Sequence, residues 1–203
     1  MPLYWPGMAT AKRETEIKLV VANLAAVRQR LRELGFRIRH SRSFEENTLW
    51  DSKARVLQRR RCMLRLRSAG GRHWLTFKGP AGRSSRFKIR QEFETELADA
   101  EAAGTILAEL GLVPVFRYEK YRTVYLGRGS WAGGEVLVDE TPIGYFVELE
   151  GSRAWIRRLA RALGATEQEF ITRDYTALYA EWCRRRRRPV QHMVFRRRRR
   201  VSA

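Results

Sequence analysis

Residues 14–18 read Glu14-Thr15-Glu16-Ile17-Lys18 and show the strand pattern that recurs along the chain. Side chains two positions apart on a β-strand point to the same side, so Glu14, Glu16 and Lys18 would share one charged face. The other face carries Ile17 and further apolar residues. If this strand stood alone, the pattern would indicate a sheet edge that turns its charged face to water.

The alternation of charged and apolar residues recurs in later segments, so this strand does not stand alone. Glu-x-Glu, followed by a helical pattern and then Leu-Gly, occurs over residues 14–35, 92–111 and 148–164. Three acidic strands that each lead into a helix favour a sheet that wraps around a shared charged axis. The alternating charges are seven acids and seven bases: Glu14, Glu16, Lys18, Arg65, Arg67, Lys78, Arg90, Glu92, Glu94, Lys120, Arg122, Asp139, Glu148 and Glu150.

The sequence predicts an α+β fold, in which a closed eight-stranded antiparallel β-barrel forms a tunnel with a charged interior and helices packed outside. Isolated buried charges are costly, so such an interior requires that the charges pair or bind ions. Asn23 and Asp99 are placed to cap two of the helices. Strands are expected over residues 13–21, 36–50, 62–68, 73–78, 87–97, 115–126, 135–139 and 145–150, and the last two helices over 155–164 and 167–182.

The 203 residues carry a net charge of +19 and a pI near 11.1, which favours a polyanionic partner. The arginine runs 184–188 and 196–200 supply ten of these charges and leave about +9 for the rest. We expect a flexible leader over residues 1–12, a folded domain over 13–183 and a disordered arginine-rich tail over 184–203. The tail suggests a nonspecific contact with nucleic acid or polyphosphate through Arg184–Arg200, and a binding protein of this kind is one alternative function.

Two cysteines, Cys62 and Cys183, lie in unlike contexts and fit a reducing compartment where both stay thiols. No apolar run approaches the length of a membrane span, and residues 1–12 lack the apolar core of a signal peptide. We therefore expect a cytoplasmic protein. The sequence gives no indication of the oligomeric state.

Acidic and basic residues segregate by strand in a way that indicates a chemistry. Clustered carboxylates without histidine or thiolate suit a hard divalent ion, Mg2+ or Mn2+. Guanidinium and ammonium groups suit phosphate oxygens. A metal-bound chain of phosphates would satisfy both sets of residues.

Seven motifs follow one another between residues 13 and 182: Glu14-x-Glu16-x-Lys18, Leu64-Arg65-Leu66-Arg67, Thr76-Phe77-Lys78-Gly79, Arg90-x-Glu92-x-Glu94, Lys120-x-Arg122, Val138-Asp139-Glu140-Thr141-Pro142-Ile143-Gly144 and Glu148-x-Glu150-Gly151. In this order they resemble the CYTH family of triphosphate tunnel metalloenzymes, which includes class IV adenylate cyclases, thiamine triphosphatases and inorganic triphosphatases. The resemblance implies a CYTH-like tunnel domain over residues 13–183, a triphosphate-containing small molecule as substrate and a requirement for Mg2+ or Mn2+.

The resemblance also implies roles for single residues. The phosphates would be held by Lys18, Arg65, Arg67, Lys78 and Arg122, with Arg90 and Lys120 as helpers. The metal would be held by Glu14, Glu16, Asp139, Glu148 and Glu150. Glu14, Glu16 and Lys78 are the catalytic candidates, one glutamate also orients the attacking water, and Glu92 and Glu94 form a further acidic pair of lesser rank.

Two reactions fit these roles and differ in the nucleophile. Water would give hydrolysis of a phosphoanhydride, whereas a ribose 3′ oxygen would turn ATP into cyclic AMP and pyrophosphate, as in a class IV adenylate cyclase. Some of these cyclases carry a His-Phe pair shortly before the first motif, and this chain has no histidine before His40. We favour a metal-dependent triphosphatase, with the cyclase as the alternative.

Overall fold

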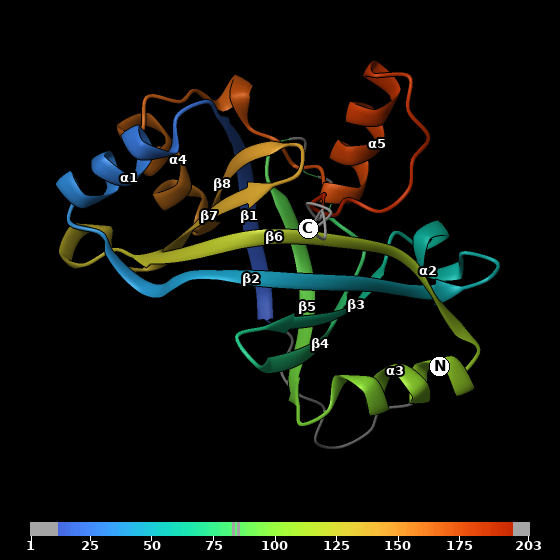
Figure 1. Cartoon of the computed structure of the whole chain (residues 1–203). Helices are drawn as coiled ribbons and strands as arrows, with labels where there is room; N and C mark the ends of the chain where they lie inside the picture. Colours follow the sequence, from blue (N-terminus) through green and yellow to red (C-terminus); the bar gives the residue numbers. More distant parts are fainter. Residues whose placement is uncertain (1–11, 83, 85, 197–203) are drawn as a thin grey trace, which may run out of the picture.

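Eight strands pair in the order β1-β5-β4-β3-β2-β6-β7-β8 and close into a barrel in the computed structural model (Figure 1). The structure describes residues 12–82, 84 and 86–196. All neighbouring strands run antiparallel, which confirms the predicted α+β fold with a closed eight-stranded barrel. The strands are β1 (Lys12–Val21), β2 (Arg37–Ser52), β3 (Met63–Ala69), β4 (Arg72–Lys78), β5 (Lys88–Leu97), β6 (Leu112–Leu126), β7 (Gly134–Thr141) and β8 (Gly144–Gly151).

Strand β1 closes the barrel because it pairs on both sides. Residues 12–16 pair with β5, and residues 16–21 pair with β8. Glu16 therefore lies opposite Lys88 on one side and opposite Glu150 on the other. The strand that carries the first motif is the seam of the sheet, and not an edge turned to water.

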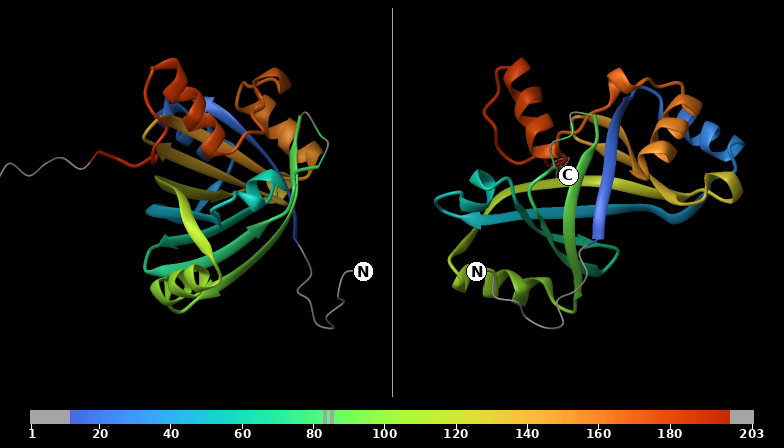
Figure 2. Two further views of the ribbon diagram at one scale, coloured as in Figure 1. Left: turned by 90° about the vertical axis from the view of Figure 1, so that its right-hand side faces the viewer. Right: turned by 180° about the vertical axis from the view of Figure 1, so that it is seen from behind.

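The helices lie outside the barrel, as predicted (Figure 2). Asn23 and Asp99 accept backbone N–H hydrogen bonds at the starts of α1 and α3, so both predicted caps are present. Helices α1 and α4 lie side by side, and Arg30 Nε donates to the Ala162 carbonyl oxygen at 2.9 Å. The helical segments are α1 (Leu24–Glu33), α2 (Val56–Arg59), α3 (Ala100–Glu109), α4 (Arg153–Ala162), α5 (Tyr175–Arg185) and the 3-10 turns η1 (Gly129–Trp131) and η2 (Glu167–Glu169).

The largest apolar core lies between the barrel wall and these helices. Ile17 and Leu19 on the outer face of β1 are buried in one cluster with Leu31 of α1 and with Ile156 and Leu159 of α4. Burying apolar side chains of this size stabilises the fold by about 1.5–3 kcal/mol each. Because the apolar faces of these strands point outward to the helices, their charged faces point into the barrel.

The last predicted helix is wrong at its start. Residues 167–169 form the turn η2, and α5 begins only at Tyr175, capped by the Asp174 side chain. Between them Ile171 exchanges two backbone hydrogen bonds of 2.9 Å with Lys18. This pairing with a distant strand satisfies backbone groups that would otherwise continue a helix.

The expected disordered tail also differs from the structure over the residues that are described. Arg184 and Arg185 belong to the last turn of α5. Met193 is fully buried and pairs with β6 beyond the end of β7, since its N–H donates to the Arg117 carbonyl and its carbonyl accepts from Glu119 N–H. The rest of the predicted tail, residues 197–203, lies outside the described part of the chain, as do residues 1–11 of the predicted leader. Among the helices that the structure describes, none is both long and apolar enough to cross a bilayer.

Candidate active site

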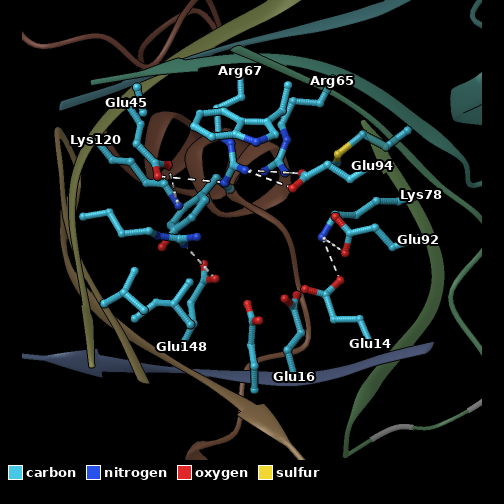
Figure 3. A pocket seen from close by; sticks show the side chains of 18 of the residues that line it. Glu14, Glu16, Glu45, Arg65, Arg67, Lys78, Glu92, Glu94, Lys120 and Glu148 are labelled. Carbon is cyan, nitrogen blue, oxygen red and sulfur yellow. Dashed lines mark hydrogen bonds and ion pairs between the residues drawn. The ribbon is translucent and has the colours of Figure 1, made fainter. Parts of the chain in front are cut away.

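A cavity of about 1090 Å3 runs inside the barrel, and its wall is made largely of the charged inner faces of the strands (Figure 3). A charged interior was the central expectation from the sequence. Two predicted residues do not line the cavity: Arg90 lines a smaller cavity beside it, and Asp139 is buried in the wall. The predicted residues that do line it are Glu14, Glu16, Lys18, Arg65, Arg67, Lys78, Lys120, Arg122, Glu148 and Glu150, together with the further acidic pair Glu92 and Glu94.

Three carboxylates form an acidic cluster on one side of the cavity. Glu14, Glu16 and Glu150 each offer a carboxylate oxygen, and these oxygens lie within 4.8 Å of one another. Burial, followed by repulsion from Glu14, Glu16 and Glu148, raises the pKa of Glu150 to about 8. An all-oxygen set whose members repel one another fits a hard divalent cation such as Mg2+ or Mn2+.

Lysines from β4 and β5 adjoin this acidic cluster. Lys78 Nζ lies 2.7 Å from Glu14 Oε2 and 3.2 Å from Glu92 Oε2, and Lys88 Nζ lies 2.8 Å from Glu16 Oε1. Burial works to lower the pKa of Lys78, but Glu14 and Glu16 outweigh it and raise the pKa above its ordinary value. Lys78 therefore stays charged next to the acidic cluster. There its ammonium group contacts the carboxylates of Glu14 and Glu92 and can also contact a bound phosphate.

Basic residues occupy the opposite side of the cavity. Figure 3 shows Arg65 and Arg67 of β3 across the cavity from Glu14 and Glu16. Arg65 Nη2 donates to Thr76 Oγ1 at 3.2 Å, and Arg67 Nη2 donates to Glu94 at 3.2 Å. Burial and the neighbouring Arg65 lower the pKa of Arg67. An anion placed between two such guanidinium groups would relieve their repulsion.

Asp139 and Glu148 are not members of the acidic cluster and face cations in this structure. Asp139 is completely buried and accepts from Lys120 Nζ at 2.9 Å, from both Arg122 Nε and Arg122 Nη2 at 2.6 Å, and from Tyr175 Oη at 2.6 Å. Glu148 lies 2.8 Å from Arg122 and 3.2 Å from Lys18. Of the five predicted metal ligands, the structure brings three together and pairs the other two with basic residues.

Besides Lys88, the sequence motifs missed two residues of the site. Glu45 on β2 is buried, with Lys120 Nζ at 3.5 Å and Arg67 at 4.0 Å. Burial opposes its ionisation, but Lys120 and Arg122 lower the pKa of Glu45 to about 2. The polar alternation Ser43, Glu45, Asn47 on β2 was the available signal. Tyr175 at the start of α5 belongs to none of the seven motifs, yet it lines the cavity and donates to Asp139.

A family model for the CYTH domain matches residues 12–169 of the chain. The chain belongs to the CYTH domain family. The match covers all eight strands, so the family assignment made from the seven motifs is confirmed.

Similar known proteins are consistent with membership of the CYTH domain family. The protein named "Putative adenylate cyclase MJ0240" from Methanocaldococcus jannaschii is 27% identical over 175 residues, which cover 81% of this chain and 97% of that protein. A solved structure from Vibrio parahaemolyticus, described as a putative adenylate cyclase, is similar to this one with a TM-score of 0.73 at 17% identity. The match covers 84% of this chain and 99% of that chain. The Hippeastrum protein HpAC1, described as having a dominant triphosphatase activity, matches with a TM-score of 0.60 at 17% identity, over 87% of this chain and 97% of its own.

Proposed function

We propose that this CYTH protein hydrolyses a phosphoanhydride bond of inorganic triphosphate or of an organic triphosphate inside its tunnel. The observation that carries the proposal is the acidic cluster of Glu14, Glu16 and Glu150, which faces the guanidinium groups of Arg65 and Arg67 within one cavity. A metal–triphosphate complex has a cationic and an anionic part, and this cavity offers a complementary group to each.

The acidic cluster is the part of the site that would hold Mg2+ or Mn2+. Its donor set is all oxygen, and burial together with repulsion from the neighbouring glutamates raises the pKa of Glu150, which supports a cation beside that carboxylate. The bound metal would supply Lewis-acid polarisation of phosphate oxygens. Glu148 lies beside the cluster and is the fourth carboxylate within reach of the same region.

The remaining charged residues act on the triphosphate itself. Arg65, Arg67, Lys120 and Arg122 would bind the phosphate oxygens and offset the negative charge that builds up on the leaving group. Lys78 would contact the phosphoryl group nearest the acidic cluster. Water attacks that phosphorus, the anhydride P–O bond breaks, and a glutamate of the cluster orients the water and accepts its proton.

Cyclisation of ATP is the alternative, and one observation favours keeping it. The volume of about 1090 Å3 is large enough for a drug-sized ligand, so an organic group can accompany the phosphates. In that reaction the ribose 3′ oxygen replaces water as the nucleophile, and pyrophosphate leaves. The relatives described as adenylate cyclases are consistent with either reaction of this site.

The test is a panel of tripolyphosphate, ATP and thiamine triphosphate with Mg2+ or Mn2+, in which released phosphate and cyclic AMP are both measured. We expect phosphate release, and we expect Arg65→Ala and Glu148→Gln each to lower kcat/KM at least 100-fold, because Arg65 would bind the phosphate oxygens and Glu148 holds Lys18 and Arg122 in the tunnel. Arg32→Ala on the exposed surface of α1 is the control and should retain wild-type turnover. Near-wild-type turnover of both tunnel variants would overturn the assignment.

The location of the protein and its contact with nucleic acid were also predicted from the sequence. A cytoplasmic location is supported by the two free cysteines, Cys62 and Cys183. The nucleic acid contact of Arg184–Arg200 has no support in the residues that the structure describes, where Arg184 and Arg185 belong to α5. The enzymatic role is therefore the one that we propose.

A further inference from the structure

A second cavity of about 240 Å3 adjoins the tunnel. It lies between the connection from β4 to β5, the first residues of β5 and the segment that leads into α5. Lys88 and Asp174 line both cavities, so the two meet at these residues. A water molecule takes up about 30 Å3 in the liquid, so the second cavity has room for a small hydrated anion.

The charge of this second cavity is strongly positive. Arg61, Lys88, Arg90 and Arg173 line it, against the single carboxylate of Asp174. That carboxylate is already engaged, because it accepts the Ala177 N–H at the start of α5. Lys88 pairs with Glu16 and Arg173 with Glu181, so the positive charge that acids leave unneutralised in the described chain is that of Arg61 and Arg90.

Two of these arginines have no acidic partner in the described part of the chain. Arg61 and Arg90 form no ion pair there, in contrast to the tunnel arginines, which all contact carboxylates. Arg90 Nε is buried and has no hydrogen-bond partner, which is also true of Nε in Arg65 and Arg67. A buried guanidinium nitrogen without an acceptor costs stability unless a ligand or water supplies one. The oxygen atoms of a phosphate fit guanidinium groups well.

We propose that the second cavity binds the inorganic phosphate or pyrophosphate that the tunnel reaction releases. The inference rests on the proposed function, since that reaction supplies the anion. The product leaves the tunnel past Lys88 and is received by Arg90, Arg61 and Arg173. Arg90, which the sequence motif placed among the substrate-binding residues, then contacts the product and not the intact triphosphate.

Binding of inorganic pyrophosphate to the full chain tests this site, measured by titration calorimetry without divalent cations. The background is Arg65→Ala, which weakens the tunnel site. The test variant adds Arg61→Ser and Arg173→Ser. The matched control adds Arg60→Ser and Arg185→Ser, which remove the same charge, and Arg185 pairs with the same Glu181 as Arg173 does.

We expect the test variant to bind pyrophosphate at least tenfold more weakly than the background, and the control to bind as the background does. Equal affinity in all three proteins would overturn the proposal, and so would an equal loss in test and control, which would indicate a general charge effect. Failure of the proposed function is read separately, as absence of triphosphate turnover by the wild-type protein. The pyrophosphate titration does not depend on that turnover.

Discussion

Glu150 is the residue in which the electrostatics of the site can be read most directly. Burial and three neighbouring glutamates raise its pKa from the ordinary 4.5 to about 8. Between these two pH values the folded protein holds a proton that the unfolded chain has released, so the contribution of Glu150 to stability falls as pH rises through this window. A divalent cation must displace that proton before it can bind all three carboxylates.

Metal affinity should therefore depend on pH through Glu150. We expect the Kd for Mg2+ or Mn2+, measured by titration calorimetry, to fall by about tenfold per pH unit between pH 6 and 8, as displacement of one proton requires. Glu150→Gln should weaken binding and flatten this dependence. Glu33→Gln on the exposed surface of α1 should leave the wild-type profile unchanged. A wild-type affinity that does not change with pH would contradict the role given to Glu150.

In the arginine-rich segment that follows α5, one buried apolar residue holds the chain against the barrel. Met193 is fully buried in a cluster that includes Phe116, Tyr118, Tyr175 and Leu178. The same segment donates Phe195 N–H to Glu119, and the Phe195 ring lies 5.4 Å from the ring of Tyr121. These contacts fix the chain beside β6 and support α5, the helix that carries Tyr175 to the cavity.

Met193→Ala should accordingly destabilise the protein. Truncating a buried methionine to alanine costs about 2–5 kcal/mol, because it removes apolar contacts and leaves a cavity. We expect this loss in the free energy of unfolding from urea titration. Val194→Ala is the control, since Val194 is 37% exposed and its truncation should cost less than about 1 kcal/mol. If both variants had the same stability, the packing role of this segment would be wrong.

The elements that the sequence predicted well are those set by local chemistry. Alternation located all eight strands, and Asn23 and Asp99 located the starts of two helices. The start of α5 was missed because apolar residues continue at helical spacing through the extended Ile171. Its pairing with Lys18, far away in the sequence, decides the local conformation, and no short-range pattern reveals such a pairing.

The fold of the whole molecule places charges that lie far apart along the chain on the wall of one cavity. The motifs identified twelve of the cavity-lining charges because each repeats the two-residue period of a strand. The other contacts of the site depend on how the barrel closes. Closure pairs Asp139 with Lys120 and Arg122, and it turns Arg90 toward the second cavity. It also buries Glu45 among basic residues, although no motif contains Glu45. Partners across a barrel depend on its register, which a single sequence does not reveal.

The proposed reaction requires that a divalent metal and a triphosphate occupy the same tunnel at the same time. Mn2+ is paramagnetic, so phosphorus relaxation of tripolyphosphate measured by NMR reports whether the two are close together on the protein. We expect the wild-type protein to enhance the relaxation produced by Mn2+, and Glu16→Gln and Arg65→Ala each to remove that enhancement, since one weakens the metal side and the other the phosphate side. An enhancement that persists unchanged in both variants would place the complex elsewhere and contradict the account.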